Sequence, residues 1–334
     1  MAMNKRTIVI GLCVLAILAA AVLLISQYTK PAGPAANLTL VDNEKMVFTA
    51  IYPEADKNRL AAIDLVQKWP RQRAIIVVEP SGVNLTEFAR GTNDLALDAM
   101  LGYVSEQGLG DADTVWVPFS EYNNYPGSPN PEEFTAAVNH FAAAAKVKFP
   151  QSRIGVLLDC RSNLAYSGRP GSWGIQPLDP YLAGLDKNNV TVLFFQGFPR
   201  VAPDEDMTRA ASFLNANTAM EAANVLGIKE ITFVTGTAAV YGPDGKYKIV
   251  HTPEQRQSIV SDELAQIDST KKAGYITKLL IFAENKSATQ ADWSYTRGKG
   301  DMAVLRNLVG AATSAGIEVS LFDPQGNIKL SSLA

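Results

Sequence analysis

Short apolar runs recur along this chain at fairly even spacing. Each is six or seven residues long, and its apolar positions are consecutive rather than alternating. The eight runs are Met46–Tyr52, Ala74–Glu79, Thr114–Phe119, Arg153–Asp159, Val190–Gln196, Glu230–Thr235, Thr277–Ala283 and Ile317–Phe322. Consecutive apolar positions over this length predict strands that are buried on both faces, as in a parallel sheet.

Amphipathic helical patterns separate these runs. They cover Asn58–Trp69, Asp94–Gln107, Glu132–Lys148, Met207–Leu226, Pro253–Ala273 and Gly300–Ala315. In the second segment Leu97, Leu101 and Val104 recur at helical spacing, which predicts one buried helix face.

Alternating strands and helices are typical of an α/β protein, and eight such strands are typical of a (β/α)8 TIM barrel. The alternative is an open, doubly wound sheet, which binds ligands at a reversal of strand order and usually carries a glycine-rich phosphate loop. The sequence has neither a G-x-G-x-x-G motif nor a P-loop. We therefore predict a barrel over residues 38–334.

The first residues have a different character. Lys5 and Arg6 precede an uncharged apolar run, Ile8–Ile25, whose 18 residues are just long enough to cross a bilayer. We predict a membrane anchor over residues 1–28, a stiff linker over 29–37, and an extracytoplasmic barrel on a single-pass protein of the cell membrane. A cleaved signal peptide is the alternative.

Composition excludes several classes of protein. The net charge of −3, with 19% charged residues, lacks the basic excess of a nucleic-acid-binding protein. There is no H-E-x-x-H or C-x-x-C motif, and the two cysteines, Cys13 and Cys160, stand far apart. We expect no metal, no cofactor and no nucleic-acid partner.

Carboxylates, amides and aromatic residues gather just after the predicted strands. In a (β/α)8 barrel this carboxyl-terminal end carries the active site. The residues that we expect to bind substrate are Asn123, Tyr122, Asp159, Trp173, Phe198, Tyr241 and Trp293. Aromatic faces pack on sugar rings, while carboxylates and amides bind hydroxyl groups. The segment Tyr241–Tyr247 predicts a hairpin at the same end.

One of these strand ends carries a longer motif. The run Trp116-Val-Pro-Phe-Ser-Glu-Tyr-Asn123 resembles the R-P-F-H-E-x-N motif of glycoside hydrolase family 26, a group of β-mannanases and related endoglycanases with a (β/α)8 barrel. The resemblance implies that Glu121 is the acid/base. Looser similarity extends to the family's G-x-x-D segment, its nucleophile strand and its final strand. These correspond to Leu85–Asp94, Lys229–Thr237 and Ile281–Asn285 with Asp292 and Trp293.

The chain also departs from the family pattern. Val117 and Ser120 replace the arginine and histidine of the acid motif, and Thr235 stands where the nucleophile strand would carry a glutamate. By our count Glu121 follows the third strand, whereas the family's acid follows the fourth.

Two functions fit these features. The first is a glycoside hydrolase acting on a β-linked, mannan-like polysaccharide, in which Glu121 and Glu284 are the two catalytic carboxylates. Asp159 and Glu79, on strands next to that of Glu121, are substitutes for Glu284. The second is a catalytically inactive barrel that binds glycan or a partner at the cell surface.

We expect the run Ile8–Ile25 to stay attached to the mature protein. The following residues, Ser26–Lys30, lack a small-residue cleavage site. Mass spectrometry of the membrane fraction should therefore detect the intact N-terminal peptide. A soluble protein that begins near Lys30 would contradict this expectation.

Overall fold

The computed structural model describes residues 44–51, 73–79, 83–112, 114–120, 130–159, 179–197, 200–201, 216–236, 239–241, 247–248, 253–282, 301–322 and 333. All of them belong to one compact unit, Thr39–Ala334. The predicted anchor Ile8–Ile25 and the predicted helix Asn58–Trp69 lie outside the described residues. Within these ranges no helix is long and apolar enough to cross a membrane.

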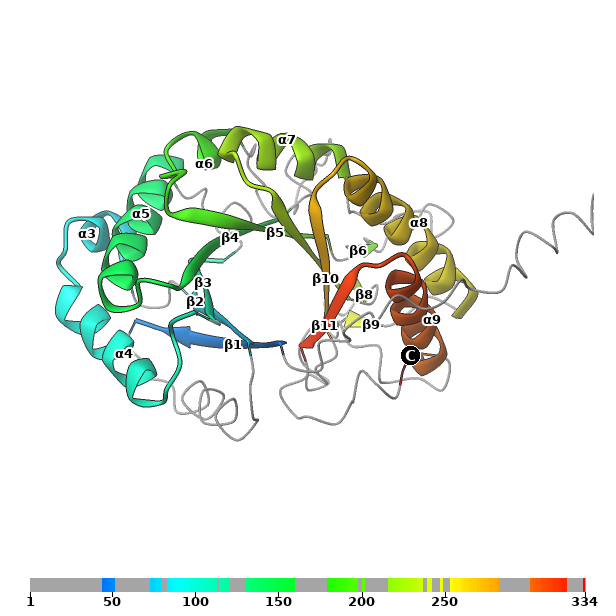
Figure 1. The fold of residues 1–334 in the computed structure, drawn as a ribbon, viewed down its shortest axis with the longest axis horizontal. Coiled ribbons are helices and arrows are strands. Elements are labelled where there is room, and N and C mark those ends of the chain that lie inside the picture. Colours follow the sequence, from blue (N-terminus) through cyan, green and yellow to red (C-terminus); the bar gives the residue numbers. More distant parts are fainter. Residues whose placement is uncertain are drawn as a thin grey trace, which may run out of the picture. The chain divides into compact units, whose positions relative to one another are not determined.

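Eight parallel strands form one sheet, and their order in the sheet follows their order in the chain (Figure 1). They are β1 (Glu44–Ala50), β2 (Arg73–Glu79), β3 (Thr114–Pro118), β4 (Arg153–Asp159), β5 (Val190–Gln196), β7 (Glu230–Thr235), β10 (Ile276–Phe282) and β11 (Glu318–Phe322). All eight predicted strands are thus confirmed, to within two residues at each end. Because the order contains no reversal, the doubly wound alternative is excluded.

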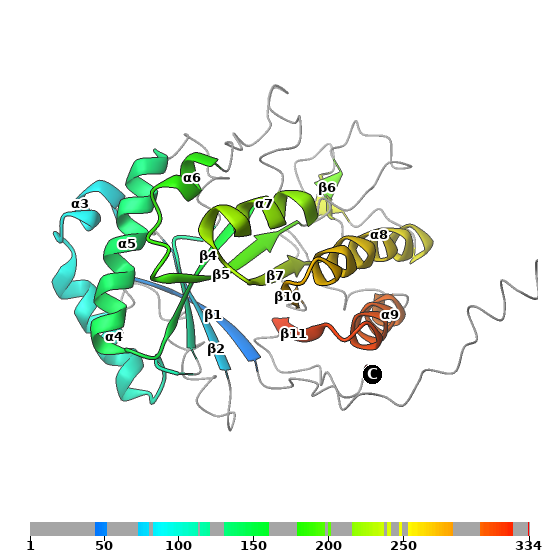
Figure 2. The ribbon, with the colours of Figure 1, turned by 45° about the horizontal axis from the view of Figure 1, so that its top comes forward.

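The sheet curves until its two end strands approach each other. Cα atoms of β1 and β11 come within 8 Å, although the hydrogen-bonded ladder of the described residues runs only from β1 round to β11. The helices cover the outer face of this curve, as Figures 1 and 2 show. They are α3 (Leu85–Ala89), α4 (Asp94–Glu106), α5 (Pro131–Lys148), α6 (Asp179–Ala183), α7 (Ala216–Leu226), α8 (Pro253–Lys272) and α9 (Asp301–Ser314). The short helices α3 and α6 were not predicted.

Helix α5 illustrates how local sequence sets these boundaries. The Asn130 side chain accepts a hydrogen bond from the Glu132 N–H at 2.9 Å, which satisfies a donor that the first helical turn leaves free. Pro131 occupies the first helical position, where its missing N–H has no cost. Lys146 and Lys148 lie in the last turn, where positive charge interacts favourably with the helix dipole.

Period-two alternation sorts the strand side chains into two layers. On β3, Trp116 joins the outer apolar core between sheet and helices, whereas Val115 and Val117 belong to a second cluster made only of strand residues, which fills the barrel interior. A Cβ on Gly155 of β4 would lie 2.6 Å from the ring of Phe194. Glycine is needed there because the Phe194 ring lies directly over the β4 backbone.

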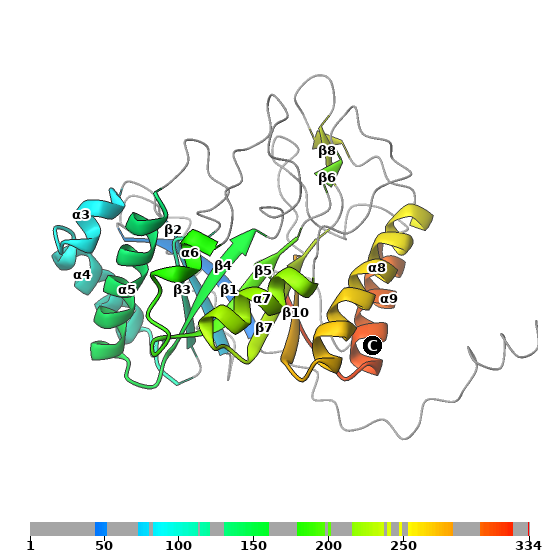
Figure 3. The same ribbon diagram turned by 90° about the horizontal axis from the view of Figure 1, so that it is seen from above.

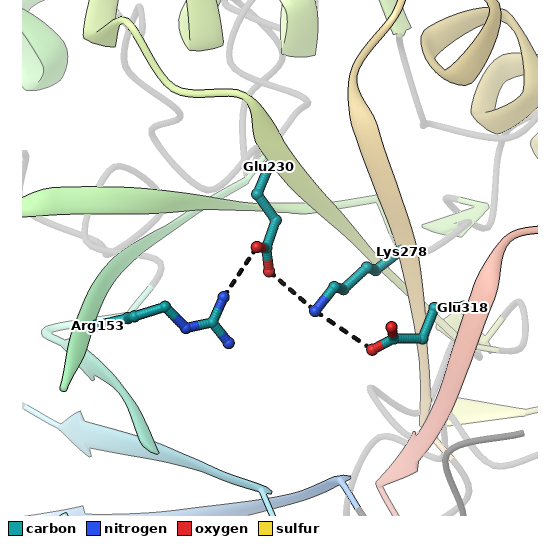
Figure 4. Close-up of polar contacts among 4 residues, drawn as sticks. All are labelled: Arg153, Glu230, Lys278 and Glu318. Atoms are coloured by element: carbon teal, nitrogen blue, oxygen red, sulfur yellow. Dashed lines mark hydrogen bonds and ion pairs between the residues drawn. The ribbon is translucent and has the colours of Figure 1, made fainter. Parts of the chain in front are cut away.

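At the amino-terminal end of the strands the interior is ionic rather than apolar (Figure 4). Arg153 donates to Glu230 at 2.8 Å, and Lys278 lies 3.1 Å from Glu230 and 3.2 Å from Glu318. Arg153, Glu230 and Glu318 are the first residues of β4, β7 and β11, and Lys278 is the third residue of β10. The formal charges of the four groups cancel, and the network links β4 to β7 across the intervening β5.

A small second sheet is formed by the segments that follow β5 and β7. Its strands are β6 (Arg200–Val201), β8 (Ala239–Tyr241) and β9 (Tyr247–Lys248), in the order β6-β8-β9. Antiparallel pairing of Tyr241 with Tyr247 confirms the predicted hairpin. Figure 3 shows β6 and β8 beyond the carboxyl-terminal ends of the barrel strands.

We expect the substitution Lys278→Ala to lower the free energy of unfolding by about 3 kcal/mol, because it leaves Glu230 and Glu318 without the cation between them. The side chain of Lys278 is only 9% exposed, so water can solvate the two remaining carboxylates only poorly. Urea unfolding of the full chain would measure the loss.

The matched control is Lys272→Ala, which removes an ion pair with Asp268 on the surface of α8. The Lys272 side chain is 76% exposed, so this change should cost at most about 0.5 kcal/mol. Equal losses for the two variants would show that the interior network contributes no more than a surface pair.

Candidate active site

The sequence assigns the candidate site to the carboxyl-terminal ends of the barrel strands. Most of the residues assigned to it from the sequence lie outside the described residues, namely Glu121, Glu284, Asn123, Tyr122, Trp173, Phe198 and Trp293. For Asp159 and Tyr241 the structure describes the backbone, as the last residues of β4 and β8. The site is therefore built from the strand ends that lead into these residues.

The strand order places two acidic strand ends on either side of β3. Strand β3, which leads to Glu121, is hydrogen-bonded to β2 on one side and to β4 on the other. Glu79 is the last residue of β2, and Asp159 is the last residue of β4. Glu79 and Asp159 thus end the two strands that flank β3, while their part in a site stays a prediction. The strand that precedes Glu284, β10, is four places further along the sheet.

The chain makes an unusual turn where β3 ends. Phe119 has a φ angle of 55°, in the left-handed region, and it is the one non-glycine residue with positive φ in the described part of the chain. A bulky residue there is a genuine outlier, and such strain costs on the order of 1–3 kcal/mol. Glu121 follows two residues later. Backbone strain of this kind concentrates at functional sites.

The segment that resembles the family's G-x-x-D motif packs behind this turn. Its Phe88, on α3, meets the Phe119 ring edge to face, with 5.2 Å between ring centroids. Asp94 is the first residue of α4, and its Oδ1 lies 2.7 Å from His140 Nε2 on α5, within hydrogen-bonding distance. The Asp94 side chain is 59% exposed and lies in the helix layer. Asp94 thus joins α4 to α5.

The seam between β3 and β4 is short. The two strands pair only at Val115 with Arg153 and at Trp116 with Ile154. By contrast, the ladder between β4 and β5 continues to Asp159 and Gln196. Among the described residues the ladder between β3 and β4 therefore stops before the end of β3 that leads to Glu121.

Strand β7 supplies no carboxylate to this end of the barrel. Thr235, its last residue, is fully buried and donates a hydrogen bond to Glu263 on α8 at 2.7 Å. Thr235 therefore faces the helix layer, not the barrel interior. Glu230 on the same strand lies at the opposite end, in the ion network. A second carboxylate at the carboxyl-terminal end would therefore have to come from another strand.

Two polar residues of this region were missed by the analysis of the sequence alone. Glu263 is fully buried, and it stands four residues after Ile259 and four before Ile267, on the apolar face of α8. An acidic residue within an apolar helix face predicts a buried side chain with a polar partner. Gln196, which is 2% exposed, ends β5 in register with Asp159. Its place as the polar last residue of an otherwise apolar strand was the corresponding signal.

The described residues contain no group of three or more histidine, cysteine, aspartate or glutamate side chains that could hold a metal ion. The acidic positions at the strand ends are instead spread over separate strands. Paired carboxylates on different strands can act as acid and base on one bound molecule.

No protein-family model matches the chain, and no curated protein matches its sequence. Solved structures that match include a β-glucosidase from Thermotoga maritima, at 12% identity and a TM-score of 0.42, with 84% of this chain and 87% of that chain covered. An exo-β-1,4-mannosidase from Opitutaceae bacterium strain TAV5 matches at 14% identity and a TM-score of 0.45, covering 87% and 51%. A GH18 chitinase from Pseudoalteromonas aurantia matches at 10% identity and a TM-score of 0.41, covering 75% and 81%. Family membership does not follow from matches at this level.

Proposed function

We propose that this protein is a glycoside hydrolase acting on a β-linked, mannan-like polysaccharide. The observation that carries the proposal is the strained turn at Phe119, which lies between a barrel strand and the acid motif residue Glu121. Carboxylates that end the two flanking strands, Glu79 and Asp159, add acid/base capacity at the same end of the barrel.

In the proposed mechanism Glu121 is the general acid. It protonates the glycosidic oxygen as the bond from that oxygen to the anomeric carbon breaks. Glu284 is the second carboxylate, which either attacks the anomeric carbon or removes a proton from the attacking water. Glu79 and Asp159 are its substitutes. Retention requires carboxyl groups about 5–5.5 Å apart, whereas inversion requires about 6.5–9.5 Å.

The aromatic and amide residues of the same end would bind the sugar chain. In this proposal Tyr122, Trp173, Phe198, Tyr241 and Trp293 supply faces for pyranose rings. Asn123 orients the substrate or Glu121 without reacting. The barrel would lie outside the cytoplasm, tethered by Ile8–Ile25, where a polysaccharide can reach it.

A catalytically inactive, glycan-binding barrel is the second candidate. The observation that favours it is the end of β7, where a family 26 enzyme would carry its nucleophile. Here that position is Thr235, which donates a hydrogen bond to Glu263 in the helix layer. A site that had lost its nucleophile would keep the strand ends and the aromatic residues while losing turnover.

We expect the substitution Glu121→Gln to lower the hydrolysis rate of β-mannan by about 10²–10⁴-fold, because the amide keeps the shape of the side chain but has no proton to transfer. Glycan binding should survive, since the amide retains most of the hydrogen bonding. A reducing-sugar assay on β-mannan, with β-glucan and xylan for comparison, would measure the rate.

The control for this experiment is Glu106→Gln, which removes an exposed carboxylate on α4. It should leave the rate on every polymer unchanged. If the wild-type protein hydrolyses none of these polymers, yet binds one of them as tightly as Glu121→Gln does, the inactive barrel is the correct function.

A further inference from the structure

The turn at Phe119 reverses the alternation of β3. Val115 and Val117 face the barrel interior and Trp116 faces the helices, so regular alternation would point Phe119 inward. The Phe119 ring instead lies in the outer core, fully buried among helix residues. The φ angle of 55° is what turns it outward. The Phe119 ring therefore lies between the sheet and the helices and not inside the barrel. We call this buried ring the Phe119 anchor.

Two kinds of contact hold this anchor. The ring lies 5.2 Å from Phe88 of α3 and 6.5 Å from Phe141 of α5, with edge-to-face geometry in both pairs. The Phe119 N–H donates to the carbonyl of Val78 on β2 at 2.6 Å. A strained conformation persists only where its surroundings determine it from several sides, as these contacts do.

The opposite side of the strand offers little support at this level. The ladder from β3 to β4 ends at Trp116, three residues before Phe119. The carboxyl-terminal end of β3 is therefore positioned from the β2 side and from the helix layer. Phe119 makes both of these connections: its N–H bonds to β2, and its ring packs in the helix layer.

We propose that Phe119 is a positioning residue for the general acid Glu121, an inference that rests on the proposed hydrolase function. Only Ser120, itself buried, separates the two residues. The orientation of the backbone at Phe119 thus sets where the chain leaves the strand toward Glu121. A general acid must lie within hydrogen-bonding reach of the leaving oxygen, and a displacement of about 1 Å can cost about 10²-fold in rate.

The test is the variant Phe119→Leu, assayed on two substrates that differ in their need for an acid. On β-mannan, whose leaving group is a sugar hydroxyl, kcat/KM should fall about 10- to 100-fold. On 2,4-dinitrophenyl β-mannobioside the leaving phenolate needs no proton, so kcat/KM, which reports only the steps up to cleavage of the glycosidic bond, should change by less than about threefold. A merely structural role would affect both substrates equally.

Phe149→Leu is the matched control. This phenylalanine is also buried in the outer core and also packs on β3, stacking on Trp116 at 5.7 Å, but toward the other end of the strand. It should show no preference between the two substrates. If Phe119→Leu is not recovered folded, Phe119→Met, whose unbranched side chain adapts to irregular space in a core, is assayed in the same way.

Three results separate the claims. A loss confined to β-mannan in Phe119→Leu, and absent in Phe149→Leu, supports the positioning role. Equal effects of the two variants on both substrates overturn it, provided that Glu121→Gln shows the selective loss on β-mannan. If Glu121→Gln also lacks that selectivity, then the proposed acid, and not only its positioning residue, is wrong.

Discussion

The parallel hydrogen-bonded ladder that runs from β1 round to β11 is the constraint on which the other features of the barrel depend. Because each strand is in register with its neighbours, residues at one level of the sheet form a layer inside the barrel. The lowest layer is ionic, with Lys278 between Glu230 and Glu318. Above it the interior is apolar, and the strand ends bring Glu79, Asp159 and Gln196 to the opposite edge.

This layering separates stability from chemistry. The carboxylates at the amino-terminal end are matched in charge by Arg153 and Lys278, so that network joins β4, β7, β10 and β11. At the carboxyl-terminal end the ladder is interrupted between β3 and β4, and the backbone is strained at Phe119. Barrels of this architecture place their active sites at that end, where loops can vary without disturbing the sheet.

The sequence predicted the strands well because each is buried on both faces, which leaves a continuous apolar run as its signature. It also indicated the acidic ends of β2 and β4, since strand order then followed from counting. It could not predict the left-handed turn at Phe119, because no local residue demands it and the conformation depends on Phe88, Phe141 and Val78. On β7 the sequence already showed Thr235 in place of the family's glutamate, but it did not show that Thr235 donates a hydrogen bond to Glu263, a residue 28 positions away in the helix layer.

The most direct test of a two-carboxylate hydrolase is the crystal structure of this protein with a bound β-mannan oligosaccharide. The quantity to measure is the distance from the Glu121 carboxyl group to the nearest second carboxyl group across the scissile bond. Our account predicts about 5–5.5 Å for a retaining enzyme or about 6.5–9.5 Å for an inverting one, with Glu284 as the partner. A structure in which no second carboxyl group lies within about 10 Å of Glu121 on the bound sugar would contradict the account.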